Sequence, residues 1–94
     1  MFADKTKVAT LMENNNAILI DMRDAVTFRD FKIEGSINLP SVRTLTNYLM
    51  LEKDKKRPVI LFASNPDDED LKAGINYSEN LGFTTYITDV RQLR

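Results

Sequence analysis

Short, unbroken apolar runs alternate along the chain with stretches in which apolar residues recur at helical spacing. The unbroken runs occupy residues 17–20 (AILI) and 59–62 (VILF). Runs without polar alternation are typical of parallel strands covered on both faces, and the second is expected at the centre of the sheet. Weaker strand patterns occupy residues 36–39 and 84–88. Strands that alternate with helical stretches predict an α/β fold with a parallel sheet.

Helical spacing predicts the segments between these strands. They cover residues 4–13, 25–30, a stretch that begins at 41, residues 66–81 and a last turn at 89–94. Ser41 is the expected N-cap of the third segment. Asn65 as N-cap, with Pro66 at the first helical position, opens the fourth segment, and Gly82 ends it.

The short helical segment at residues 25–30 carries two aromatic side chains at or near its end. Asp24 precedes it as a candidate N-cap. With the helix starting there, Phe28 and Phe31 are expected to face the core.

Size and charge indicate a single folded domain. The chain has 94 residues, 43% of them hydrophobic and 29% charged, which fits one domain spanning residues 1–94. Its 13 basic and 14 acidic residues give a net charge of -1, so nucleic acid is not expected as a partner. No apolar run approaches the roughly 20 residues that cross a bilayer, so no membrane partner is expected either. We expect a cytoplasmic protein.

The chain contains neither cysteine nor histidine. This excludes disulfides, thiolate metal sites and catalysis by a thiol of the chain itself. It also removes the side chain that most often carries protons near neutral pH. We therefore expect no cofactor.

Residues 18–40, ILIDMRDAVTFRDFKIEGSINLP, resemble the first half of a rhodanese-like sulfurtransferase domain. That family shows an apolar strand running into Asp-x-Arg, then an aromatic residue, a glycine turn and Ile-Asn-x-Pro. The matching positions here are Asp21, Arg23, Phe28, Gly35 and Pro40. Segments 59–62 and 81–83 match the family's second half. The resemblance implies one small α/β domain, with a parallel sheet of four to five strands and helices on both faces, in which these motif residues are structural.

The loop after residues 59–62 departs from the family pattern. In rhodanese-like sulfurtransferases this loop carries a cysteine thiolate that accepts sulfur, while backbone amides and a helix N-terminus stabilise negative charge. Here Ala63 stands at the nucleophile position, and Pro66 has no N–H to donate. The related phosphatase branch also uses a cysteine in this loop and is excluded with it. The degenerate loop comprises Ala63, Ser64, Asn65, Pro66, Asp67, Asp68 and Glu69.

Four acidic residues, 67–70, follow Pro66. They complete a favourable helix start, because each acid in a first turn stabilises the helix by about 0.3–1 kcal/mol. Our hypothesis is that these carboxylates occupy the ancestral anion pocket and repel an incoming anion. Arg23 is interpreted as a structural residue rather than as an anion ligand: it and Asp21 pair with neighbouring backbone or with each other and so fix the turn after the strand.

Because the chain resembles this family but lacks its catalytic thiol, we predict a catalytically inactive module for protein recognition or regulation. Its partner would be another protein or a second copy of the chain. Tyr48, Met50 and Leu51 would form an apolar contact surface for this purpose if all three are exposed.

Enzymatic alternatives stay open at the level of sequence. One is a sulfurtransferase whose partner protein supplies the thiol. Another is a metal-dependent activity in which Asp67, Asp68 and Glu69, together with Asp21, bind Mg²⁺ or Ca²⁺. A third uses Ser64 as nucleophile, for which a lysine would have to serve as base.

Overall fold

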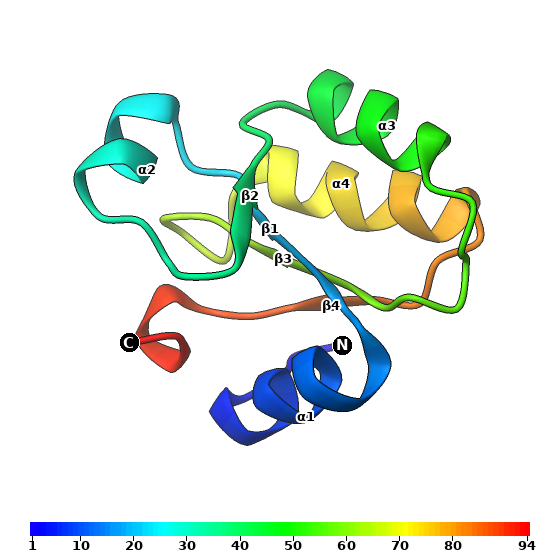
Figure 1. Cartoon of the computed structure of the whole chain (residues 1–94). Helices are drawn as coiled ribbons and strands as arrows, with labels where there is room; N and C mark the ends of the chain where they lie inside the picture. The colour runs from blue at the N-terminus through cyan, green and yellow to red at the C-terminus, as the bar shows by residue number, and fades with distance from the viewer.

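The parallel sheet predicted from the apolar runs is present, with the unbroken runs as its interior strands. The computed structural model describes residues 1–94 and contains one sheet of four parallel strands in the order β2-β1-β3-β4 (Figure 1). The strands are β1 (Ile18–Asp21), β2 (Ser36–Asn38), β3 (Val59–Phe62) and β4 (Thr85–Ile87). Every residue of β1 and β3 is buried, as their unbroken apolar character predicted.

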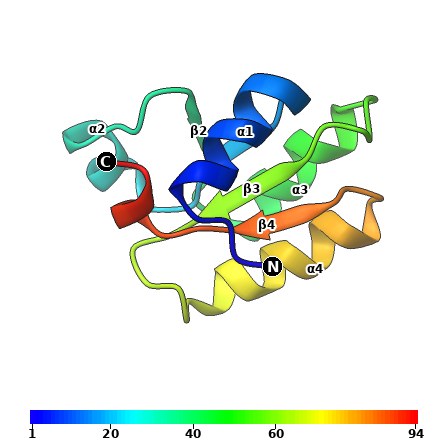
Figure 2. The ribbon, with the colours of Figure 1, turned by 90° about the horizontal axis from the view of Figure 1, so that it is seen from below.

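Helices cover both faces of the sheet, as expected. Helices α3 (Val42–Leu51) and α4 (Glu69–Asn80) lie over one face, and α1 (Lys5–Asn15) lies over the other (Figure 1, Figure 2). The short α2 (Ala25–Asp30) stands beyond the carboxyl end of β1, on the same side of the molecule as the 3-10 turn η1 (Val90–Gln92). None of the helices has the length and apolar content needed to cross a membrane.

Two hydrophobic cores form because successive residues of a strand point to opposite faces of the sheet. Ile18 and Ile20 belong to the core under α3 and α4, whereas Leu19 belongs to the core under α1. The α3–α4 core contains the buried residues Ile18, Ile20, Met22, Leu45, Leu49, Val59, Leu61, Ala63, Leu71 and Phe83. The α1 core contains Ala3, Val8, Leu11, Ala17, Leu19, Ile33, Ile60 and Phe62. Strands β1 and β3 therefore contribute side chains to both cores.

The N-terminal residues lie beside β4, a position that the sequence did not predict. Phe2 pairs with Ile87 as an isolated parallel bridge. The Ala3 N–H donates to the Ile87 carbonyl at 2.8 Å, and the Thr88 hydroxyl donates to the Ala3 carbonyl at 2.7 Å. These residues thereby cover the outer edge of β4, where backbone groups would otherwise lack partners.

Helix α4 begins at Glu69 rather than at Pro66, so the predicted N-cap is wrong. Asn65 instead opens a turn, in which the Asp68 N–H donates to the Asn65 carbonyl at 3.0 Å and Pro66 takes the second position that proline favours. Asp68 is the N-cap, and its carboxylate accepts from two N–H groups of the first helical turn. The helix starts there because the Asp68 side chain satisfies these otherwise free donors.

Phe31 does not face the core, contrary to the prediction. Its side chain is 46% exposed, and Phe28 is half-buried. Helix α2 has no buried residue, because it stands beyond the end of the sheet rather than on one of its faces. Its N-cap is the predicted one: the Asp24 carboxylate accepts from the Thr27 N–H at 2.9 Å.

Gly74 brings α4 close to the sheet and to α3. A Cβ atom at this position would lie 2.9 Å from Leu45 Cδ2, 3.2 Å from Met22 Sδ and 3.3 Å from Leu61 Cδ1. Leu45 and Leu61 are fully buried, so they have little room to move aside. The contact explains a glycine in the middle of a helix, where it is otherwise unfavourable.

We expect Gly74→Val to lower the free energy of unfolding by about 1–3 kcal/mol, because the added methyl groups overpack the α3–α4 core. Urea denaturation followed by circular dichroism measures this. Asn76→Val is the matched control, since Asn76 is an exposed residue of the same helix, and its effect should stay within about 0.5 kcal/mol. Equal stability of the two variants would contradict the close approach at Gly74.

Candidate functional site

The carboxyl ends of β1, β3 and β4 meet at one edge of the sheet, where α/β proteins commonly bind ligands. Strands β1 and β3 end level, with Asp21 paired to Phe62. An open cleft of about 390 Å³ lies at this edge. It is lined by Arg23, Thr27, Ser64, Pro66, Asp89, Val90, Arg91 and Arg94. The cleft thus combines the turn after β1, the degenerate loop after β3 and the segment after β4.

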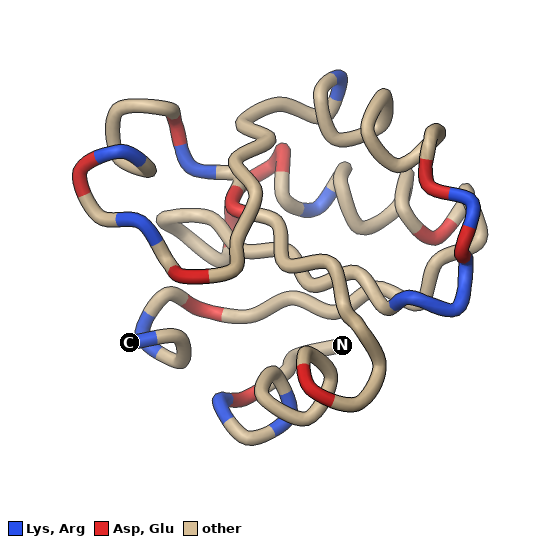
Figure 3. The backbone as a smooth tube through the Cα atoms, viewed as in Figure 1, with Lys and Arg blue, Asp and Glu red and all other residues tan.

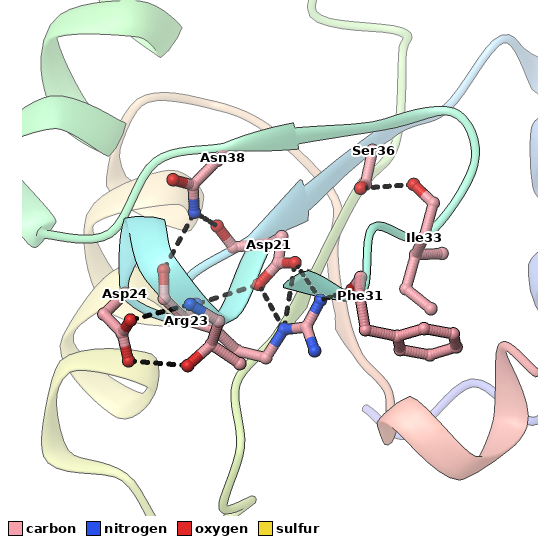
Figure 4. Close-up of polar contacts among 8 residues, drawn as sticks. Asp21, Arg23, Asp24, Phe31, Ile33, Ser36 and Asn38 are labelled. Atoms are coloured by element: carbon pink, nitrogen blue, oxygen red, sulfur yellow. Dashed lines mark hydrogen bonds and ion pairs between the residues drawn. The ribbon is translucent and has the colours of Figure 1, made fainter. Parts of the chain in front are cut away.

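Asp21 and Arg23 form a buried ion pair at the end of β1, as the sequence predicted. Arg23 Nη2 lies 2.6 Å from Asp21 Oδ2, and Arg23 Nε donates to both carboxylate oxygens at 3.0 Å (Figure 4). The Arg23 backbone N–H also donates to Asp21 Oδ1, at 2.9 Å. Asp21 is fully buried and Arg23 is 6% exposed. Such a pair is costly to bury, so its geometry and extra hydrogen bonds matter for stability.

Two further contacts tie this ion pair to its surroundings. Arg23 Nη2 donates to the Phe31 carbonyl at 2.7 Å, which anchors the end of α2. The Asn38 side chain donates to the carbonyls of Asp21 and Arg23, at 3.0 and 2.8 Å, which anchors the turn to the end of β2. Arg23 Nη1 has no hydrogen-bond partner in the chain, and Figure 4 shows it without a dashed line. Because Arg23 lines the cleft, this nitrogen is available to a ligand there.

A second Asp-x-Arg unit, which the sequence analysis missed, follows β4. Arg91 Nη2 lies 2.7 Å from Asp89 Oδ2, and the Nε and backbone N–H of Arg91 donate to Asp89 Oδ1 at 3.1 and 2.8 Å. This is the bonding pattern of Asp21 and Arg23, but the Arg91 side chain is 82% exposed. The side-chain hydrogen bond from Arg91, helped by its backbone N–H, lowers the pKa of Asp89 to about 2. The repeated Asp-x-Arg spacing at the end of a strand was the signal that could have revealed the unit.

Basic side chains predominate around the cleft. Its lining includes three arginines and one acidic residue, Asp89, and none of the acidic residues 67–70 lines it. The Arg94 guanidinium lies over the Phe31 ring, 4.9 Å from its centre, and has no ion-pair partner in the chain. Figure 3 shows the basic residues at the C-terminal end of the chain on the same side as α2. Residues 67–70 therefore do not fill this cleft. One of them, Asp68, does occupy donors at the N-terminus of α4, as the hypothesis of an occupied anion pocket expects.

Side chains of the degenerate loop accept from three backbone N–H groups in the loop and the first turn of α4. The Asp67 N–H donates to Asn65 Oδ1 at 2.9 Å. The N–H groups of Asp70 and Leu71 donate to Asp68 Oδ1 at 2.8 and 3.1 Å. The carboxylate of Asp68 thus already occupies these two donors at the N-terminus of α4.

The remaining loop positions divide between interior and surface. Ala63, at the expected nucleophile position, is 7% exposed. Ser64 and Pro66 line the cleft, whereas the side chains of Asp67 and Glu69 are exposed elsewhere. No group of three or more acidic side chains is placed to share a metal ion, and both Asp21 oxygens already accept hydrogen bonds from Arg23.

The other family-motif positions support the turns on either side of β2. Gly35 has φ of 83°, a conformation that glycine adopts without strain, and it leads the chain into β2. Pro40 is exposed and lies between β2 and α3. Phe28 lies near Lys32, whose Nζ is 5.4 Å from the centre of the ring.

The chain belongs to the rhodanese-like family, because a family model described as Rhodanese-like domain matches residues 4–92. Its fold is similar to a single-domain sulfurtransferase, RDL2, from Saccharomyces cerevisiae, with 17% identity, a TM-score of 0.68, and coverage of 98% of this chain and 86% of that one. The BH2092 protein from Bacillus halodurans has 17% identity and a TM-score of 0.73, over 94% of this chain and 65% of that one. A rhodanese-like domain of the Alr3790 protein from Anabaena sp. has 22% identity and a TM-score of 0.61, over 77% of this chain and 79% of that one. No curated protein matches. Within this sulfurtransferase-related family, the chain is a version without cysteine.

We expect Asp21→Asn to lower the free energy of unfolding by about 3–5 kcal/mol, because it leaves the buried Arg23 charge without its partner. Asp89→Asn is the matched control, because it removes the carboxylate from the same bonding pattern beside an exposed arginine. It should lower the free energy of unfolding by about 0–1 kcal/mol. Urea denaturation of both variants tests the difference. Similar losses in the two variants would show that burial does not distinguish the pairs.

We expect Arg91→Gln to raise the pKa of Asp89 from about 2 toward the ordinary value of about 3.9. Because the pKa of Asp89 is lower in the folded state, the stabilisation that the pair provides is present above the unfolded pKa and is lost as the pH falls toward 2. Carboxyl-carbon NMR titration measures the shift, with Lys56→Gln as a control of equal charge change. An unchanged Asp89 midpoint in Arg91→Gln would refute the assigned cause.

Proposed function

We propose that this protein is a non-catalytic member of the rhodanese-like family that serves as a protein-recognition module. The observation that carries the proposal is the buried Ala63 at the nucleophile position, in a chain without cysteine. Sulfur transfer in the family requires a thiolate as the attacking group, and alanine has no reactive side chain.

The hydrogen bonds of the loop support the loss of catalysis. An anion-binding loop needs free N–H groups that point at the ligand. Here the N–H of Asp67 and the N–H groups at the start of α4 are taken by the side chains of Asn65 and Asp68. A substrate anion would have to displace the Asp68 carboxylate, which is covalently part of the chain and therefore always present.

Exposed apolar side chains support a recognition role. Met50 and Leu51, at the end of α3, are 63% and 81% exposed, and Phe31 beside the cleft is 46% exposed. Tyr48, expected next to Met50, is half-buried and packs against the α3–α4 core. Covering such apolar groups with a partner removes them from water, which lowers the free energy of the complex.

Enzymatic alternatives receive no support from the site. A partner protein that supplied its own thiol would have to place it near Ala63, which is 7% exposed. A metal-dependent activity would require several converging oxygen ligands, and no three acidic side chains are grouped to hold an ion, while Asp68 is engaged in capping α4.

We expect no thiosulfate-to-cyanide sulfur transfer by the wild-type protein or by Ala63→Cys, because a thiol at position 63 would be buried and Asp68 already caps the N-terminus of α4. Ser64→Cys is the matched control, since Ser64 is exposed and lines the cleft. Iodoacetamide should alkylate the native Ser64→Cys protein readily and the native Ala63→Cys protein slowly. Turnover by the wild type would overturn the proposed function, and turnover by Ala63→Cys alone would show that the loop had kept its anion-binding capacity.

A further inference from the structure

We propose that the cleft at the carboxyl edge of the sheet binds a carboxylate carried by an acidic segment of a protein partner. This inference rests on the proposed recognition function and names the chemistry that the partner must present. It follows from guanidinium groups that face the cleft with hydrogen-bonding capacity left over. The site lies beside the degenerate loop but uses side chains rather than the loop's backbone amides.

Unused donors are found at two depths of the cleft. At its base, Arg23 is 6% exposed, yet its Nη1 has no partner in the chain, whereas its Nε and Nη2 are bonded. Nearer the solvent, the Arg94 guanidinium has no hydrogen bond or ion pair in the chain and rests on the Phe31 ring. Arg23 Nη1 is not among the buried polar atoms that lack a partner, so it is open to water from the cleft. A ligand that accepts from it replaces this water with a charge-assisted hydrogen bond.

The two Asp-x-Arg pairs hold their guanidinium groups in fixed positions. Asp21 binds Arg23 through Nε and Nη2, and Asp89 binds Arg91 through the same two nitrogens. In both cases Nη1 is left free. Because the arginine side chains are already ordered, a ligand does not have to immobilise them, which lowers the entropic cost of binding.

A carboxylate fits these donors better than a tetrahedral oxyanion does. Tetrahedral anions are commonly held by several backbone N–H groups at a helix N-terminus, and here Asp68 takes the N–H groups of Asp70 and Leu71. What remains is the whole Arg94 guanidinium, whose paired N–H donors can hold the two oxygens of a carboxylate, and the single Nη1 groups of Arg23 and Arg91. The Ser64 hydroxyl also lines the cleft and can donate a further hydrogen bond.

The surroundings of the cleft favour a protein segment over a small free acid. Phe31, under Arg94, is 46% exposed, and Val26, on α2 next to the cleft-lining Thr27, is 55% exposed. Val90 adds an apolar group to the cleft itself. A chain segment with an acidic residue beside an apolar one would pair its charge with the arginines and cover these apolar side chains.

A fluorescein-labelled peptide in which glutamate alternates with phenylalanine tests this inference on the full chain by fluorescence anisotropy. We expect it to bind at least about tenfold more tightly than the same peptide with glutamine for glutamate, because charge-assisted hydrogen bonds to arginine are lost. Arg94→Gln should weaken binding by about tenfold for the same reason. Lys56→Gln, an equal charge change in the loop between α3 and β3, which lies at the opposite end of the molecule from the C-terminus (Figure 1), should alter the Kd by less than about twofold.

Several results would overturn the inference. These are equal affinity for the two peptides, an unchanged Kd in Arg94→Gln, or an equal loss in Lys56→Gln, which would indicate attraction by net charge alone. Displacement of the peptide by inorganic phosphate but not by acetate would assign the cleft to a tetrahedral anion. Acetate that bound as tightly as the peptide would assign it to a small acid. Absence of peptide binding together with absence of sulfur transfer would reject this inference alone, whereas sulfur transfer by the wild type would reject the proposed function.

Discussion

The buried ion pair between Asp21 and Arg23 is the interaction on which the carboxyl edge of the sheet depends. A charge in the protein interior is tolerated only when a partner and further hydrogen bonds compensate for its lost hydration. Asp21 supplies the opposite charge, and the Phe31 carbonyl accepts a further N–H of Arg23 at 2.7 Å. The pair therefore fixes the turn after β1 and the end of α2 at once. The position of Phe31 on the surface, and of Arg94 above it, follows from this anchoring.

The chain retains the framework of the rhodanese-like fold but lacks the cysteine thiol that performs the chemistry of the family. The framework consists of packing and hydrogen bonds that are needed for stability whether or not chemistry takes place, such as Gly74 between α4 and the sheet. Sulfur transfer depends on a single side chain, the cysteine thiolate of the family. In this chain the buried Ala63 stands at that position. With no thiolate to serve, the helix N-terminus is stabilised more simply by Asp68 as an internal cap. Stability and sulfur transfer thus place different demands on the same loop.

One bonding pattern has two physical consequences in this molecule, according to its burial. In both Asp-x-Arg units the carboxylate accepts from Nε and Nη2 of the arginine two residues on. Beside the buried Arg23, loss of the partner would leave a charge uncompensated in a low-dielectric interior. Beside Arg91, which is 82% exposed, water screens the attraction, so the pair contributes little to stability and mainly orients the guanidinium.

The sequence by itself determined what depends on neighbouring residues. Unbroken apolar runs placed β1 and β3, the Asp-x-Arg spacing predicted the pair of Asp21 and Arg23, and the lack of cysteine excluded thiol chemistry. The start of α4 was misplaced because Asn65 and Asp68 are both good N-caps, and the choice between them depends on the turn that connects β3 to the helix. Only the tertiary structure brought Arg91 and Arg94 beside Arg23, and Phe2 beside Ile87. These residues are far apart along the chain, so no local propensity relates them, and their meeting is decided by how the strands and helices pack.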